Sequence, residues 1–164
     1  IRFEEDKTRP MGRSASGVRG ITLNGPSDEV IGMVSVSDSE TEILVVSENG
    51  YGKRSSLDDY RTTNRGGKGV KTLSITDKTG ELVSIKNVSD LDDLMIINKS
   101  GIAIRMDVAH LRVMGRATQG VKLINLKGTD TIAAVAKVMK DDEEIPEVSE
   151  DDVPTSETDG TNLE

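Results

Sequence analysis

One basic phrase occurs three times along this chain at nearly constant spacing. Each copy has the form Arg-x3-Arg-x3-Gly-Val followed by Arg or Lys, over residues 9–19, 61–71 and 112–122. The second copy begins 52 residues after the first, and the third begins 51 residues after the second. A constant period of this length is typical of repeat architectures, in which each copy occupies the same place in successive structural units. The three phrases should therefore lie in a row, and a row of cations can bind a polyanion.

The cations of these phrases are the candidate binding residues. They are Arg9, Arg13, Arg19, Arg61, Arg65, Lys68, Lys71, Arg112, Arg116 and Lys122. None of the three windows contains Asp or Glu, an exclusion that solubility alone does not require. We therefore predict that these side chains lie at the rim of the fold, outside the core. We also expect that the middle arginines, Arg13, Arg65 and Arg116, can be replaced without loss of the fold.

The overall net charge of the chain conceals the concentration of positive charge in the three basic phrases. The chain has 164 residues, with 21 Lys and Arg against 29 Asp and Glu, and a net charge of -8. Residues 141–164 hold 11 of the acidic residues and no Lys or Arg, which leaves 21 bases against 18 acids in residues 1–140. With two prolines and few apolar residues, this C-terminal acidic segment is predicted to be disordered. It either competes with a polyanion for the basic phrases or only aids solubility.

The repeat extends into segments with the pattern of β-strands. Apolar runs at residues 43–50 and 94–101 end in the turn signals Asn49-Gly50 and Ser100-Gly101, and each is followed by a second short run. This pattern predicts a β-hairpin, with a type I′ turn at Asn-Gly. After each Gly-Val pair, alternating apolar residues predict a further strand, and a fourth is expected at residues 30–36, 82–88 and 132–139.

Four strands in a unit of about 51 residues are typical of an all-β fold of propeller-like blades of four-stranded antiparallel sheet. We expect units at residues 1–42, 43–93 and 94–140, the first without its hairpin and therefore incomplete. Such a chain is expected to be part of a longer protein. Aromatic residues make up only 2% of the chain, so the core should consist of Val, Ile, Leu and Met.

The sequence predicts no catalytic or metal site. It contains no Walker A loop, dinucleotide fingerprint, HExxH motif or cysteine, and His110 is its one histidine. Asp90, Asp92 and Asp93 fall between two predicted strands, where Asp is a common turn residue. No signal peptide or apolar run of transmembrane length is present. We therefore expect a non-enzymatic chain with no membrane partner.

The basic phrases favour a duplex over a single strand. No aromatic residue lies within the three windows, whereas proteins that bind single-stranded DNA or RNA commonly stack bases on aromatic side chains. Cations and glycines on loops are suited to phosphate contacts that carry little sequence information. The expected partner is double-stranded DNA bound through its backbone and curved around the blades.

Three longer phrases resemble a known family. They are Gly-Tyr-Gly-Lys-Arg at residues 50–54, Tyr-Arg-Thr-Thr-Asn-Arg-Gly-Gly-Lys-Gly-Val at 60–70 and Val-Met-Gly-Arg-Ala-Thr-Gln-Gly-Val at 113–121. With the acidic segment that follows, they resemble the C-terminal domain of bacterial DNA gyrase A. The resemblance implies a β-pinwheel of usually six blades, of which this chain would be the last three. It also implies that neighbouring blades exchange strands.

The resemblance further implies a function. The family wraps duplex DNA around its rim in support of ATP-dependent negative supercoiling, and the ten cations correspond by position to the rim cations. The implied partners are DNA, the rest of gyrase A, and gyrase B in an A2B2 holoenzyme of the bacterial cytoplasm. ATP and Mg²⁺ would serve the holoenzyme, and this chain would bind no cofactor.

Two alternatives remain open at this stage. The signature box of the gyrase family, Gln-Arg-Arg-Gly-Gly-Arg/Lys-Gly, is absent, and residues 64–69 only partly resemble it. The related subunit of topoisomerase IV is therefore the first alternative. A propeller that serves as a scaffold for protein interactions is the second, although loops free of acidic residues argue against it.

Overall fold

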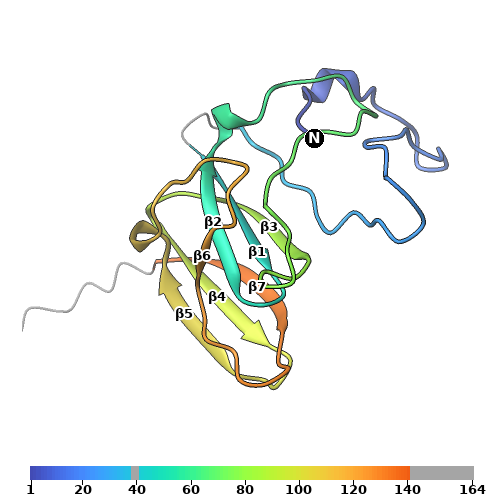
Figure 1. Cartoon of the computed structure of the whole chain (residues 1–164). Helices are drawn as coiled ribbons and strands as arrows, with labels where there is room; N and C mark the ends of the chain where they lie inside the picture. Colours follow the sequence, from blue (N-terminus) through green and yellow to red (C-terminus); the bar gives the residue numbers. More distant parts are fainter. Residues whose placement is uncertain (38–40, 141–164) are drawn as a thin grey trace, which may run out of the picture.

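The computed structural model describes residues 1–37 and 41–140, and its strands form two antiparallel sheets (Figure 1). The first sheet has the order β3-β1-β2-β6, with β1 at Glu42–Ser47, β2 at Tyr51–Ser56, β3 at Leu82–Val88 and β6 at Val121–Lys122. The second sheet has the order β5-β4-β7, with β4 at Asp92–Asn98, β5 at Ala103–Asp107 and β7 at Ile132–Met139. The described residues also include three single-turn 3-10 helices: η1 at Glu5–Lys7, η2 at Leu57–Asp59 and η3 at Val108–His110.

Both predicted hairpins form, but the turn at Asn49-Gly50 is not of type I′. β1 pairs with β2 and β4 pairs with β5, each joined at the predicted glycine. A type I′ turn needs a positive φ at both central residues, yet only glycines have one among the described residues: 79° at Gly50 and 86° at Gly101. Hydrogen bonds of 3.1 Å from the N–H of each glycine, to Ser47 and Asn98 respectively, close the turns.

Strand β1 is buried on both faces, which explains its unbroken apolar run. Leu44 and Val46 pack with Leu94 and Ile96 of the second sheet. On the opposite face, Ile43 and Val45 belong to a separate core cluster that includes apolar residues of the first unit. Burial of each such side chain stabilises the fold by about 1.5–3 kcal/mol. The first sheet therefore lies between its two neighbouring units, as blades do.

The exchange of one strand between units decides where strands form. β3 and β7 pair with the first strand of their own hairpins, whereas β6 pairs with β2 of the preceding unit. The first sheet thus has the expected four strands. In the described part of the chain, β5 has only one neighbouring strand.

Several predicted strands of the first two units are absent, and this corrects the sequence interpretation. Residues 21–23, 30–36 and 73–75 form no strand, and only Val121–Lys122 is a strand in the third unit's corresponding segment. Among the described residues, no hairpin pairs with the segments at 21–23, 30–36 or 73–75. A strand without a partner leaves its N–H and C=O groups unpaired, so the alternation of apolar residues is not sufficient. Figure 1 shows the first unit, in blue, as a winding segment beside the green second unit.

The core also differs from expectation in composition. The buried apolar residues are Ile, Leu and Val with Tyr60, and no Met is among them in the described part of the chain. Met33 and Met139 are 88% and 76% exposed. The predicted disorder of residues 141–164 lies outside the described residues. Within residues 1–37 and 41–140, no helix has the length and apolar character needed to cross a membrane.

Candidate nucleic-acid interface

The three basic phrases form loops, here named the first (residues 9–19), second (61–71) and third (112–122) basic loops. The last two residues of the third loop are strand β6, and the other residues of the three loops lie outside the sheets. Eight of the ten predicted cations are exposed: Arg9, Arg13, Arg19, Arg61, Lys68, Lys71, Arg112 and Lys122. The other two, Arg65 and Arg116, are half-buried. Across the described residues, none of the ten forms an ion pair with a carboxylate. Their positive charge is therefore not neutralised locally.

An arginine of the preceding unit fixes the start of the second and third loops. Arg2 donates from Nη1 to the carbonyl of Tyr60 at 3.2 Å and to that of Leu57 at 3.0 Å. At the equivalent place one unit later, Arg54 donates from Nε to the carbonyl of Leu111. Tyr60 and Leu111 immediately precede the first cation of each loop. Each loop therefore leaves its unit at a point held by the unit before it.

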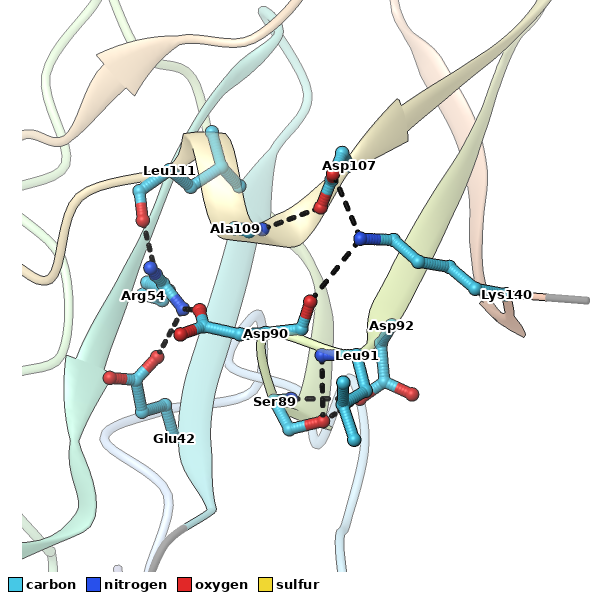
Figure 2. A network of polar contacts seen from close by, with 10 residues as sticks. All are labelled: Glu42, Arg54, Ser89, Asp90, Leu91, Asp92, Asp107, Ala109, Leu111 and Lys140. Carbon is cyan, nitrogen blue, oxygen red and sulfur yellow. Dashed lines mark hydrogen bonds and ion pairs between the residues drawn. The ribbon is translucent and has the colours of Figure 1, made fainter. Parts of the chain in front are cut away.

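The side chain of Arg54 is the centre of a polar network between the two sheets (Figure 2). Its Nη1 lies 2.9 Å from Oε2 of Glu42 and also contacts the Asp90 carboxylate. The arginine side chain is 9% exposed, so these carboxylates compensate a charge that has left water. Lys140 links the same region to Asp107 at 2.8 Å and to the Asp90 carbonyl at 3.3 Å.

The three aspartates considered for a metal site all lie in ion pairs with cations. Asp90 contacts Arg54, Asp92 lies 3.6 Å from the amine of Lys137, and Asp93 lies 2.6 Å from Nε of Arg105. Asp92 also accepts a 2.8 Å hydrogen bond from the Ser89 N–H, as an aspartate in a turn does.

The glycine of the Gly-Val pair allows the end of the third loop to approach the preceding unit. Gly120 has φ of 77°, and a Cβ there would lie 2.5 Å from the carbonyl oxygen of Gly52 on β2. Gly69 has φ of 78°, and a Cβ there would lie 2.9 Å from the backbone nitrogen of Ile1. Only glycine accepts both this backbone conformation and this approach.

The middle arginines of the second and third loops lie outside the core, but their guanidinium groups donate to backbone carbonyls, a role that the sequence did not predict. Arg65 donates from Nε to the carbonyl of Lys7 at 3.1 Å and from Nη1 to that of Arg19 at 2.5 Å. Arg116 donates from Nε to the carbonyl of Asp59 at 3.1 Å and from Nη1 to that of Lys71. Each guanidinium thus connects its own loop to the unit before it.

Sequence reasoning missed one buried cation. Lys53 on β2 is 1% exposed and donates from Nζ to the carbonyls of Gly115, at 2.6 Å, and Arg116. Burial lowers the pKa of Lys53 to about 8, the nearby Asp59 carboxylate opposes this shift, and Arg116 adds to it. The repeat offered no signal, because Ile1 and Ile104 occupy the equivalent positions. The recurrence of Arg2, Arg54 and Arg105, by contrast, is visible in the sequence.

Comparisons of this chain with a family model and with known proteins agree on one family. A family model described as DNA gyrase C-terminal domain, beta-propeller, matches residues 1–37, 41–89 and 92–139. The chain is 49% identical to the DNA gyrase A protein of Staphylococcus aureus (strain NCTC 8325 / PS 47) over 162 residues. It is 50% identical over 163 residues to the corresponding protein of strain MRSA252. These alignments cover 98% of the chain and 18% of each relative.

Solved structures share the architecture. A structure of the DNA gyrase A C-terminal domain superposes with a TM-score of 0.75 at 28% identity, covering 84% of this chain and 46% of the other. A crystal structure of the C-terminal domain of DNA topoisomerase IV superposes with a TM-score of 0.77 over 84% of this chain and 42% of the other. At 20% identity, the second likeness concerns the fold alone.

Proposed function

The chain belongs to the DNA gyrase C-terminal domain family, and from this premise we propose that its basic loops bind the backbone of double-stranded DNA and wrap it. The observation that carries the proposal is the set of exposed cations on three successive loops without carboxylate partners in the described region. Neutralisation of phosphates releases condensed counterions, which is the dominant source of affinity for nonspecific DNA binding.

The loops are built for contact with phosphates and not for reading bases. Apart from β6 at the end of the third loop, they lie outside the sheets. They contain no aromatic side chain, so they lack a stacking platform for single strands. No described helix exceeds a single turn, so none can lie along a major groove. Backbone contacts of this kind position a duplex without selecting its sequence.

The chain is a non-catalytic domain of a type II topoisomerase, and its role is to set the path of the DNA. We propose that the wrapped duplex is presented to the rest of gyrase A for strand passage. Gyrase B in an A2B2 assembly, with ATP and Mg²⁺ bound outside this chain, would drive negative supercoiling in the bacterial cytoplasm. The pinwheel would occupy residues 1–140. Within the superfamily, the family match favours gyrase over the topoisomerase IV alternative.

Affinity measured as a function of salt tests the proposal. A labelled duplex of random sequence is titrated with protein of native length at several salt concentrations. If about six phosphates are neutralised, the logarithm of the binding constant falls with the logarithm of salt concentration at a slope of about -5. A flat response to salt would exclude the basic loops as the binding surface.

A matched pair of variants locates the surface. Arg112→Ala with Lys122→Ala removes two exposed cations of the third basic loop, and Lys99→Ala with Lys127→Ala removes two exposed cations outside the loops. Both double variants lower the net charge equally. The loop variant should reduce the magnitude of the salt slope by about 2, whereas the control should bind as the native protein does. Equal loss in both would indicate a diffuse charge effect.

A further inference from the structure

Arg65 and Arg116, the middle arginines of the second and third basic loops, make the same hydrogen bonds at equivalent positions. Nε of each bonds a carbonyl at the end of the preceding unit's 3-10 turn, Lys7 for Arg65 and Asp59 for Arg116. Nη1 of each bonds the carbonyl of the last cation in the preceding basic loop, Arg19 or Lys71. Two donors on one planar guanidinium therefore connect the middle of one loop to a residue just before the preceding loop and to that loop's last residue.

Backbone hydrogen bonds reinforce this connection. The N–H of Gly66 donates to Gly20 at 2.8 Å, and that of Thr22 donates to Gly67 at 2.9 Å. One unit later, the N–H of Ser74 donates to Thr118 at 3.1 Å. Loops joined in this way cannot shift independently of one another.

Arg116 is held from three directions. Its side chain bonds the second unit, its N–H donates to Oδ2 of Asp59 at 3.2 Å, and its carbonyl accepts from buried Lys53. The charge of Arg116 adds to the field of the third loop, but its Nε and Nη1 donors are directed at protein carbonyls. The flanking Arg112 is exposed, and no hydrogen bond occupies its guanidinium within the part of the chain that the structure describes.

We propose that Arg65 and Arg116 are positioning residues that hold successive basic loops in register, while the exposed cations beside them contact phosphate. The inference rests on the proposed function of the loops. A duplex that curves over several loops meets each one at a phosphate spacing fixed by its own helix, so cations on loops of variable spacing could not engage it together. The middle arginines supply the fixed spacing, and the outer cations supply the affinity.

The chemistry of Arg and Lys separates the two roles. Lysine keeps the positive charge but has one donor nitrogen in place of a planar fork, so it cannot bridge the two carbonyls in the same geometry. A phosphate contact made by charge alone survives replacement of Arg by Lys. A bridge that depends on the fork does not.

The test uses three double variants in protein of native length. Arg65→Lys with Arg116→Lys keeps charge and removes the fork, and Arg65→Ala with Arg116→Ala removes both. Arg61→Ala with Arg112→Ala removes the same residue type and charge from exposed positions in the same loops. Each is measured for the salt slope of duplex binding, for the linking-number change trapped when a nicked circle is ligated around the protein, and for hydrogen exchange of the Thr22, Gly66 and Ser74 amides.

The positioning role predicts a distinct result for each variant. The lysine variant keeps its charge but should lose most of the trapped linking-number change and show a shallower salt slope, because loops out of register engage fewer phosphates together. It should also exchange the three amides about tenfold faster or more. The Arg61 and Arg112 variant should lower the magnitude of the slope by about 2 with native exchange rates. The alanine variant should combine both defects.

The outcomes also separate this inference from the proposed function. A lysine variant that wraps DNA and protects the three amides as the native protein does would overturn the positioning role. Native protein that binds no duplex would overturn the proposed function, and the exchange rates of the lysine variant would still show whether the arginines hold the loops. If the alanine variant fails to fold, the lysine variant carries the test alone.

Discussion

Lys53 reaches from β2 into the third basic loop, where its Nζ lies 2.6 Å from the carbonyl oxygen of Gly115. The side chain is almost completely buried, and this desolvation is the main reason that its pKa falls to about 8 from an ordinary value of 10.5. Although Lys53 lies near the proposed DNA surface, its amine donates hydrogen bonds to backbone carbonyls of the protein. Its protonation state differs between the folded and unfolded chain over an accessible range of pH.

Lys53 should make stability rise with pH above about 8. Between pH 8 and 10.5 the unfolded chain keeps a proton on this lysine that the folded chain has lost, so the unfolded state binds more protons and the free energy of unfolding increases. Denaturant unfolding of native protein and of Lys53→Met at about pH 7.5 and about pH 9.5 measures this difference. From the lower to the higher pH, the free energy of unfolding of the native protein should rise relative to that of Lys53→Met. Lys99→Met, a change at an exposed lysine, should track the native protein, and a native-minus-Lys53→Met difference that falls with pH would contradict the assignment.

Arg54 should be far more important for stability than the equivalent Arg105. Arg54 is 9% exposed and compensates Glu42 and Asp90, whereas Arg105 is 46% exposed and pairs with Asp93. Loss of one partner in a buried ion pair costs about 3–5 kcal/mol, and loss of a surface pair costs about 0–1 kcal/mol. Denaturant unfolding of Arg54→Met and Arg105→Met compares them. Equal losses would show that the network in Figure 2 contributes no more than a surface pair.

Gly120→Ala should destabilise the fold more than the same change at the equivalent Gly17. Both glycines have positive φ, 77° and 79°, and a Cβ in this conformation costs about 1–2 kcal/mol. At Gly17 no atom lies within 4 Å of the added Cβ, whereas at Gly120 the Gly52 carbonyl oxygen would lie at 2.5 Å. The collision should add about 1–3 kcal/mol and weaken the β2–β6 pairing. Because the two variants share the backbone strain, the difference between their melting temperatures measures the effect of the collision at Gly120. Indistinguishable melting temperatures would argue against the close approach.

Truncation after Lys140 should strengthen DNA binding at low salt. The removed residues carry 11 carboxylates and no Lys or Arg, and a covalently attached anionic segment competes with DNA at an effective concentration on the order of millimolar. Salt screens this competition, so the advantage of the truncated protein should shrink as salt rises. Titration of one duplex with both proteins at low and high salt measures it. Equal affinities at low salt would favour a role in solubility alone.

The repeat by itself was sufficient to predict much of the architecture. The period of the basic phrase placed three equivalent loops, and the hairpins at β1–β2 and β4–β5 followed from apolar runs that end in a turn signal. β3 and β7 form at the predicted residues because each pairs with a hairpin encoded in its own unit. Local patterns are reliable where the hydrogen-bond partner is also local.

Only the tertiary structure decided which cations serve the fold and which remain exposed. Arg61 and Arg65 lie four residues apart with the same side chain, yet one is exposed and the other bonds carbonyls 46 and 58 residues away. Those acceptors are backbone groups, which every residue type possesses, so no pattern of side chains marks them. The sequence determines how much positive charge each loop carries. The stacking of one unit on the next determines which guanidinium meets a carbonyl and which meets solvent.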